Sequence, residues 1–496
     1  MIKQNFAIEK VPSDLDAIVV GSGSGGLATA VTLAKAGRRV LVLEQHDQAG
    51  GSLHTFVEKG YEFDVGVHYI GEMGKEDISK FTIDQLTDGQ IEWERMEDSY
   101  DVVSIGLGKE NRKFNTTGMG LDAWKELLYE QFPGEHSGIE AYFKLLRELG
   151  GPTRKIAYVL KLLPLWFAWL IINTGVLRLV TPTFREKFRT KSTLQLINEL
   201  TKNQDLRQVM CYLWGDLGVV PSESCFSIHG LISLHYTKSG GYYPIGGASE
   251  FALSMIPIVE RAGGKVLVRA NVEQILHNGR KVMGVRVRKG NTSLVYDIEA
   301  PCIVSNAGLK NTFQKLLPKN VAEKSYFHKL SVDLRPSWGT FQAFIGLNAS
   351  KEELGLKPQN TWISLDNSCG RTFLEYMNLK REDAVARKPP LMFLSFPSAK
   401  DPNWGKHSGR EDKSTCILIT GAKWEWYEEF AGTTLHKRGD EYEELKAAFG
   451  DSMVEMACEL FPQLRHHIDY VEFSTPLTNN YYFAQQYVST LCPVTR

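Results

Sequence analysis

The chain has 496 residues, with 57 basic and 58 acidic side chains and a hydrophobic fraction of 43%. This length suits about three domains with a large buried core, and the balanced charge gives no global field that would hold nucleic acid. Seven cysteines without a C-x-x-C pair indicate neither a zinc site nor a disulfide framework, so we expect no metal. Residues 1–15 contain no apolar stretch of the kind found in secretory signals.

A glycine motif near the start of the chain predicts binding of an adenine dinucleotide. Ala17–Val20 is a short β-branched run, as expected for a strand buried on both faces. It leads into Gly21, Gly23 and Gly26 in the order G-x-G-x-x-G. The glycines allow a tight turn, close approach of a pyrophosphate and close helix packing. The helix predicted over 27–35 then offers its free N–H groups to phosphate.

An acidic residue completes this pattern. A second strand is predicted over 39–43, and Glu44 stands at its end, about twenty residues beyond the glycines, where ribose hydroxyls need an acceptor. A glutamate favours an unphosphorylated ribose, and therefore FAD or NAD rather than NADP at this site. Gly50 and Gly51 follow, with two interpretations: an ordinary loop, or a flavoprotein turn that touches the FAD pyrophosphate.

Two longer strings then indicate a family. VLVLEQHDQAGGSLHTF (Val40–Phe56) and EFDVGVHYIG (Glu62–Gly71) closely resemble the retinol saturases, or all-trans-retinol 13,14-reductases. These belong to the phytoene-desaturase-like and carotenoid-isomerase-like flavoproteins. The resemblance extends over 16–477 and includes FPSAKDPNW (Phe396–Trp404) and STPLTN (Ser474–Asn479).

Helices are predicted over 121–150, interrupted at Pro133-Gly134, and Leu162–Leu177 is an unusual apolar segment inside the helical region. This segment has no charge over 16 residues, which is shorter than the ~20 residues that span a bilayer. Its tryptophans and basic flanks suit a helix in the membrane interface, and a helix roofing an internal pocket is the other interpretation. A lipophilic substrate entering from the membrane would reconcile the two.

The helical region continues over 198–220, after which a second part of the dinucleotide domain is expected. A glycine-rich loop over 240–247 leads into a helix over 249–261. Gly246-Gly247 reads as a hairpin or a second phosphate loop, but no preceding strand or following acid supports a second Rossmann unit. Further strands are predicted over 265–275, 282–288, 293–298 and 303–308, and later over 341–347, 391–396 and 416–420.

The resemblance implies an α/β fold, in which a discontinuous, three-layer, Rossmann-like FAD-binding domain carries an inserted mixed-sheet and helical substrate domain. The implied parts are a first FAD segment (12–115), a helical substrate or membrane-contact region (116–235), a second FAD segment (236–310), a substrate domain (311–480) and a divergent C-terminal end (481–496). In the family the chain continues past STPLTN with a strand, a glycine-rich turn and a helix directed at the flavin. Residues 482–496 show none of these, so we expect weak FAD binding.

Cofactor-binding residues follow from the motif and the resemblance together. His68 lines the flavin ring or is a satisfied structural histidine, and the resemblance puts Val272 near the adenine. No catalytic residue is singled out, because the sequence has no Ser-His-Asp set or carboxylate pair of the required kind. The predicted cofactor-binding residues are Gly21, Ser22, Gly23, Gly26, Glu44, Gln45, Gly51, Ser52, His68 and Val272.

The resemblance also implies a reaction. It is the FAD-dependent reduction of a carbon–carbon double bond in a lipophilic polyene alcohol, all-trans-retinol to 13,14-dihydroretinol, with NAD or NADP as an electron source. Two alternatives stay open: a carotenoid isomerase or desaturase, and a non-catalytic, membrane-associated variant. The implied partners are a retinoid and a membrane surface, and the implied location is peripheral on the endoplasmic reticulum membrane.

Overall fold

The computed structural model of the chain describes residues 2–153, 159–174, 191–334, 338–408, 411–435 and 437–483. Two predicted segments therefore lie partly outside the described residues. The apolar segment is described as far as Thr174, without most of its basic flanks, and the divergent end is described as far as Phe483.

A four-stranded parallel sheet forms the centre of the dinucleotide domain. Its strands run in the order β10-β2-β1-β14, so segments from both ends of the predicted domain meet in one sheet. The two predicted N-terminal strands are confirmed. The strands are β1 (Ala17–Val20), β2 (Val40–Leu43), β10 (Lys265–Leu267) and β14 (Ile303–Ser305).

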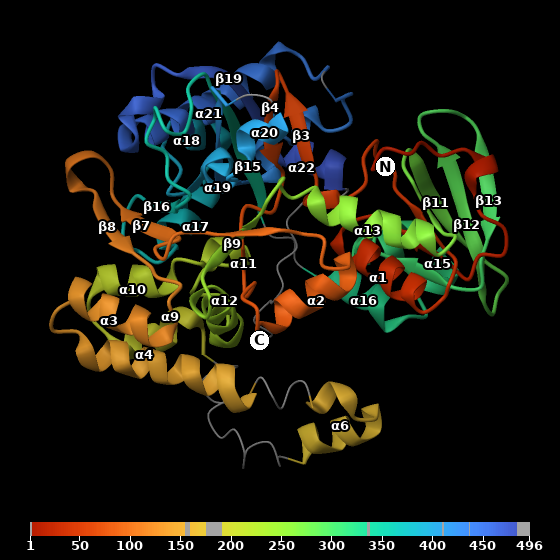
Figure 1. Cartoon of the computed structure of the whole chain (residues 1–496), viewed down its shortest axis with the longest axis horizontal. Helices are drawn as coiled ribbons and strands as arrows, with labels where there is room; N and C mark the ends of the chain where they lie inside the picture. Colours follow the sequence, from red (N-terminus) through yellow and green to blue (C-terminus); the bar gives the residue numbers. More distant parts are fainter. Residues whose placement is uncertain are drawn as a thin grey trace.

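Two further layers cover the two faces of this sheet (Figure 1). Helices α1 (Ser24–Lys35) and α13 (Glu250–Arg261) pack on one face. An antiparallel sheet of β11 (Ala270–His277), β12 (Val282–Lys289) and β13 (Val295–Glu299) packs on the other. The predicted discontinuous three-layer domain is confirmed. Helix α1 begins three residues before its predicted start, inside the glycine motif.

Strands β1 and β2 are apolar along their whole length because a layer covers each face of the sheet. Val19 and Val42 point into the core shared with the helices, whereas Ile18 and Leu41 point into the core shared with the antiparallel sheet. Because both faces are buried, each strand is apolar throughout rather than alternating.

A seven-stranded mixed sheet forms the second large unit, in the order β19-β15-β18-β17-β16-β7-β8. Only β16 and β7 pair in parallel; their neighbours are antiparallel. The strands are β7 (Asp101–Ile105), β8 (Arg112–Asn115), β15 (Gly339–Leu347), β16 (Asn360–Ser364), β17 (Leu391–Ser395), β18 (Ser414–Ala422) and β19 (Ile468–Ser474).

Helices on the two sides of this sheet complete its core. The predicted break at Pro133-Gly134 separates α3 (Leu121–Gln131) from α4 (His136–Glu148). The others in this unit are α9 (Thr193–Leu200), α10 (Gln204–Cys211), α11 (Trp214–Leu217), α12 (Phe226–Thr237), α17 (Arg371–Met377), α18 (Arg381–Val385), α19 (Pro397–Lys400), α20 (Trp404–Ser408), α21 (Asp440–Leu460) and α22 (Pro476–Phe483).

The sheet pairings divide the chain at different places from the predicted segments. Strands β7 and β8 lie within the predicted first FAD segment, 12–115, yet they pair in the seven-stranded sheet. Conversely η5 (Thr312–Leu316), which follows residue 310, buries Leu316 in the core of the dinucleotide domain. Local patterns do not reveal which sheet a strand joins, because β7 meets its partner more than 250 residues away, with Asp101 opposite Asn360.

Residues 241–244 of the predicted glycine-rich loop 240–247 form a strand, so the loop prediction was wrong for this part. Strand β9 (Gly241–Pro244) lies between β5 (Ile70–Gly71) and β6 (Trp93–Arg95). Gly246 and Gly247 then form a turn, in which the Gly247 N–H donates to the Pro244 carbonyl at 2.9 Å. Strand β9 contains one glycine, Gly241, and the strand-favouring Tyr242 and Tyr243, and its pairing with β5 and β6 holds it extended.

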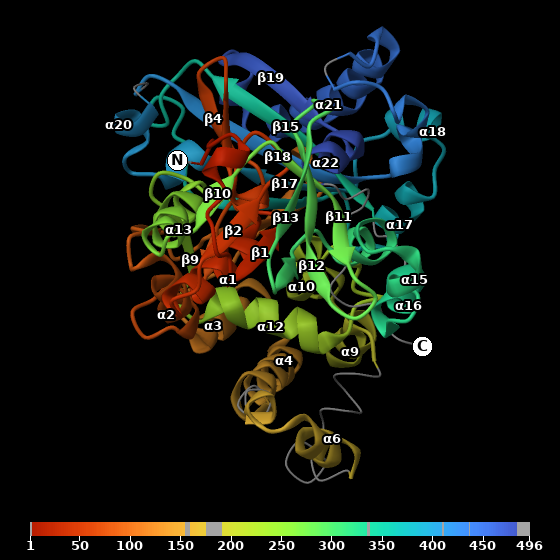
Figure 2. The ribbon, with the colours of Figure 1, turned by 90° about the vertical axis from the view of Figure 1, so that its right-hand side faces the viewer.

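Helix α6 (Leu165–Asn173) lies apart from the rest of the molecule (Figures 1 and 2). Its side chains are largely exposed, with Leu165 at 89%, Trp166 at 70% and Trp169 at 66%. Within the described part of the chain, none of the helices is long and apolar enough to cross a bilayer. The remaining short elements are β3 (Thr55–Glu58), β4 (Tyr61–Asp64), α2 (Ile78–Thr87), α14 (Leu309–Asn311), α15 (Lys319–Ala322) and α16 (Tyr326–Asp333).

Candidate functional site

A cavity of about 1570 Å³ runs between the dinucleotide domain and the seven-stranded sheet. Its lining comes from the glycine loop, the chain after β2, β11, α11, β15 and α22. Pockets for a single small molecule usually measure about 300–1,000 Å³. The cavity therefore has room for a dinucleotide and a second ligand together.

The glycine loop forms an open cradle, and a side chain in place of its glycines would fill that space. A Cβ on Gly26 would lie 2.0 Å from the carbonyl oxygen of Gly21, and a Cβ on Gly51 would lie 2.9 Å from the Cα of Gly23. Gly51 also has a φ of +57°, in the left-handed region. The second glycine pair thus lies directly against the first loop, which favours the flavoprotein interpretation of Gly50-Gly51 over an ordinary loop.

Glu44 holds this cradle together from the end of β2. Its Oε2 accepts from the Ser22 N–H at 3.0 Å and the Ser22 hydroxyl at 2.6 Å, and its Oε1 accepts from the His46 N–H at 3.0 Å. The Ser22 oxygen in turn accepts from the Gly50 N–H at 3.1 Å. The carboxylate is buried and its position is fixed before any ligand binds.

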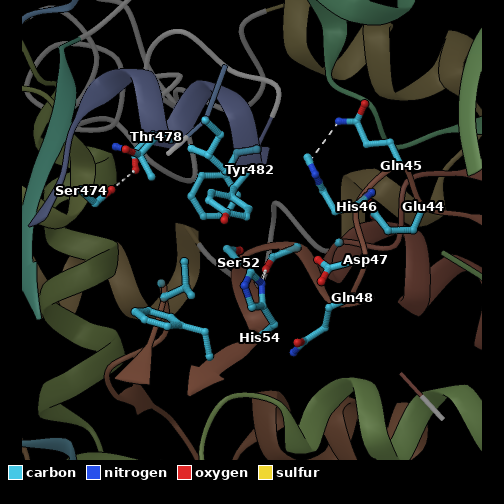
Figure 3. Close-up of a pocket in the computed structure, with 18 of the residues that line it drawn as sticks. Glu44, Gln45, His46, Asp47, Gln48, Ser52, His54, Ser474, Thr478 and Tyr482 are labelled. Carbon is cyan, nitrogen blue, oxygen red and sulfur yellow. Dashed lines mark hydrogen bonds between the residues drawn. The ribbon is translucent and has the colours of Figure 1, made fainter. Parts of the chain in front are cut away.

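The structure brings most of the predicted cofactor residues to one cavity, and Figure 3 shows three of them, Glu44, Gln45 and Ser52. Ser22 and Gly26 support the cradle from behind. Those that line the cavity are Gly21, Gly23, Glu44, Gln45, Gly51, Ser52, His68 and Val272. Val272 lies on β11.

Helix α22 faces this loop from the other side of the cavity, and the sequence pattern gave no sign of it. Figure 3 shows Thr478 and Tyr482 opposite Ser52 and His46. The ring centroids of His46 and Tyr482 lie 5.9 Å apart. The loop after β2 and helix α22 therefore approach each other across the cavity.

His68 lines the cavity from the turn before β5. Its side chain is buried, and both ring nitrogens have no hydrogen-bond partner among the described residues. Burial, with a smaller effect from the Lys400 ammonium, lowers the pKa of His68 to about 3. A buried polar group without a partner is costly, so a neutral imidazole awaiting a ligand is favoured over a satisfied structural histidine.

Lys400 lies beneath His68 and was not predicted from the sequence. Its Nζ donates to the His68 carbonyl at 2.7 Å, the Asn360 Oδ1 at 2.6 Å and the Ser395 hydroxyl at 2.7 Å. Burial lowers the pKa of Lys400 to about 7, opposed by the negative charges of Asp64 and Asp101. The sequence did offer one sign of it: Lys400 follows closely after the apolar strand LMFLSF, where a lysine is buried. Lysines are rarely buried without partners, so this lysine needed acceptors.

Asp101 is the second buried charged residue beside the cavity, after Lys400. Its carboxylate accepts from the Tyr69 hydroxyl at 2.9 Å, the Tyr212 hydroxyl at 3.1 Å and the Asn360 amide at 2.8 Å. Burial raises the pKa of Asp101 to about 6, and these donors oppose the rise. Asn360 thus links Lys400 to Asp101, and the network holds the His68 carbonyl and the Tyr69 hydroxyl.

One part of the cavity lining, which we call the apolar end, is aromatic and aliphatic. Phe56, Phe344 and Ile419 line it from β3, β15 and β18, and the rings of Phe56 and Phe344 meet edge to face at 5.0 Å. Such a surface suits a lipophilic ligand beside a polar cofactor end. In the described part of the chain no cluster of His, Cys, Asp and Glu has the arrangement of a metal site.

The fold and the site together define an oxidoreductase that binds an adenine dinucleotide. A family described as NAD(P)-binding Rossmann-like domain matches residues 19–82. The chain is 42% identical to all-trans-retinol 13,14-reductase of Danio rerio over 98% of its own length and 78% of that protein, and 40% identical to the Homo sapiens enzyme over the same shares. The chain belongs to the all-trans-retinol 13,14-reductase family.

Two more distant comparisons complete these findings. A Danio rerio protein named inactive all-trans-retinol 13,14-reductase is 37% identical over 96% of this chain and 77% of that protein. Among solved structures, an oxidoreductase from Methanosarcina mazei superposes with a TM-score of 0.58 at 17% identity, covering 97% of this chain and 90% of that one. This second likeness shows the shared fold.

Proposed function

We propose that the chain is an FAD-dependent reductase that saturates the 13,14 double bond of all-trans-retinol. The observation that carries this proposal is the cavity. It joins a dinucleotide cradle around Gly23 and Glu44 to an apolar end at Phe56 and Phe344 in a family of retinol reductases. FAD, when bound and reduced, supplies the hydride for such a reduction.

Each end of the cavity has its own role in this proposal. The glycine cradle leaves space for a pyrophosphate against backbone N–H groups, and Glu44 accepts from the adenosine ribose. The neutral imidazole of His68 hydrogen-bonds the cofactor or the retinol hydroxyl. Phe56, Phe344 and Ile419 exclude water from the polyene.

Anaerobic turnover tests the proposal. The purified protein, supplied with FAD, should show the absorbance bands of the bound cofactor and, once reduced, convert all-trans-retinol to 13,14-dihydroretinol. Separate NADH and NADPH additions test the proposed electron source. Bound FAD without any product would place the chain with its inactive relative, and conversion of a carotene instead would indicate the isomerase or desaturase alternative.

Replacing Glu44 with alanine should weaken FAD binding by about 1.5–3 kcal/mol, because the ribose hydroxyls and Ser22 would lose a charged acceptor. Titration of FAD into the two apoproteins measures the difference. Glu299→Ala, an exposed glutamate on β13, is the control and should bind FAD like the wild type. Equal affinities in all three proteins would show that the ribose does not contact Glu44.

The second part of the proposal is that α6 lies on a membrane surface, with the endoplasmic reticulum as the membrane. Its exposed Leu165, Trp166 and Trp169 support this part. None of the nine residues of α6 lines the cavity, which disfavours a pocket roof. Amphipathic or apolar helices with tryptophans bind the boundary between headgroups and acyl chains.

Flotation with phosphatidylcholine and phosphatidylserine vesicles tests this second part. Trp166→Glu/Trp169→Glu should abolish flotation, because each side chain that no longer enters the interface removes about 1.5–3 kcal/mol of burial. Met283→Glu/Leu294→Glu, at exposed apolar positions on the antiparallel sheet, is the matched control and should float normally. Unchanged flotation of the tryptophan variant would contradict membrane binding by α6.

A further inference from the structure

Reduction of a double bond needs a proton as well as a hydride, and the structure contains a candidate donor. Asp216 lies in α11 and lines the same cavity as His68. The neighbouring Gly215 fixes its position, because a Cβ there would lie 2.5 Å from the Trp362 ring on β16. Helix α11 is therefore packed directly on the substrate sheet, and the carboxyl of Asp216 faces the cavity.

The surroundings of Asp216 leave its carboxyl free to react. No hydrogen bond or ion pair involves its side chain within the described residues, in contrast to Asp101, which has four donors from Tyr69, Tyr212, Asn360 and Trp362. The titratable groups that interact with it are Asp101 on β7, Tyr69 before β5 and Tyr236 on α12, and His68 lines the same cavity.

These neighbours determine the protonation of Asp216. Asp216 is exposed in the cavity, and desolvation of its carboxyl by the surrounding protein raises its pKa to about 8, with a further rise from the charge of Asp101. The group therefore carries its proton at neutral pH. A general acid is most effective when its pKa lies near the working pH.

His68, Lys400 and Tyr69 are poorer proton donors than Asp216. The pKa of His68 is lowered to about 3, so its imidazole is neutral and has no proton to give readily. The ammonium of Lys400 is directed to three protein acceptors. The hydroxyl of Tyr69 donates to Asp101, and burial raises its pKa well above its usual value.

We propose that Asp216 is the catalytic acid that protonates one carbon of the reduced double bond. This inference rests on the proposed function. The O–H bond of the Asp216 carboxyl breaks and a C–H bond forms at one alkene carbon, while the other carbon receives the hydride that the reduced cofactor supplies. Both electrons of the reduction come with the hydride, and the carboxylate of Asp216 regains its proton from water in the cavity.

Two measurements test the proposal on the purified, FAD-loaded protein. The first is infrared titration: a C=O band of a protonated carboxyl should disappear with a midpoint near pH 8 in the wild type and be missing from Asp216→Asn. The second is a single anaerobic turnover of the chemically reduced protein with all-trans-retinol. Asp216→Asn should slow it by about 10²–10⁴-fold, Asp216→Glu should restore part of the rate, and FAD and retinol affinities should change less than twofold.

The dependence on pH gives a further readout. Because the acid must be protonated, the wild-type rate should fall as the pH rises through about 8, and Asp216→Asn should lack this fall. Asp451→Asn, an exposed aspartate on α21, should behave like the wild type.

The outcomes separate this inference from the proposed function. A wild type that binds FAD but reduces no retinol would overturn the function, and the infrared titration would still report on Asp216. A wild-type rate with an unchanged pH profile in Asp216→Asn would overturn the inference alone. Equal losses in the Asn and Glu variants, together with weakened retinol binding, would make Asp216 structural and would also overturn it.

Discussion

Replacing Lys400 with methionine is expected to destabilise the seven-stranded sheet by about 3–5 kcal/mol, because Asp64 and Asp101 would remain buried without their nearby cation. The carbonyl of His68 and the side chains of Asn360 and Ser395 would also lose their donor. Hydrogen–deuterium exchange in β7, β16 and β17 measures the loss, since the free energy of opening can be read strand by strand.

Lys109→Met is the matched control for this variant. Lys109 is exposed between β7 and β8, so its replacement should change the free energy of opening by less than about 0.5 kcal/mol. Exchange rates in β16 and β17 that are the same for both variants would show that the buried lysine adds no net stability. Because His68 is held through its carbonyl, Lys400→Met should also lower turnover.

Replacing Gly26 with alanine should nearly abolish function. The new Cβ would lie 2.0 Å from the carbonyl oxygen of Gly21, a backbone atom that cannot move without moving the cradle. Overpacking of this kind costs about 1–3 kcal/mol of stability. A displacement of about 1 Å in the positioning of a reactant can slow turnover by about 10²-fold. Thermal unfolding, the FAD absorbance retained after gel filtration, and turnover measure the three effects.

Gly25→Ala provides the comparison one residue away. Its Cβ would meet the end of the Asn306 side chain at 2.7 Å, and a side chain can turn aside. We therefore expect this variant to keep its fold and most of its FAD. If Gly26→Ala retained FAD equally well, the close packing of α1 on the glycine loop would not be required.

The dinucleotide cradle was predictable because its determinants are local. Gly21, Gly23 and Gly26 stand at fixed spacing between a strand and a helix, and Glu44 follows at the end of the next strand. The exchange of hydrogen bonds among Ser22, Glu44 and Gly50 was not predictable, since it depends on how two loops meet.

The apolar helix shows what the sequence left open. Its lack of charge was compatible with a membrane surface and with a pocket roof, because an apolar side chain fits either environment. No residue of α6 lines the cavity, which disfavours the roof, and Figure 2 shows α6 apart from the sheets. Its place on a membrane stays a prediction.

From the sequence alone came the class of cofactor, because glycine spacing and apolar strand patterns act over a few residues, and the resemblance to the family implied the three-layer domain. Only the tertiary structure decided that 241–244 is a strand, that 101–115 joins the seven-stranded sheet, and that Lys400 and Asp101 share one buried network. The protonation of Asp216 belongs to this second group. Burial and neighbouring charge determine a pKa, and both arise from segments that meet only in the folded chain.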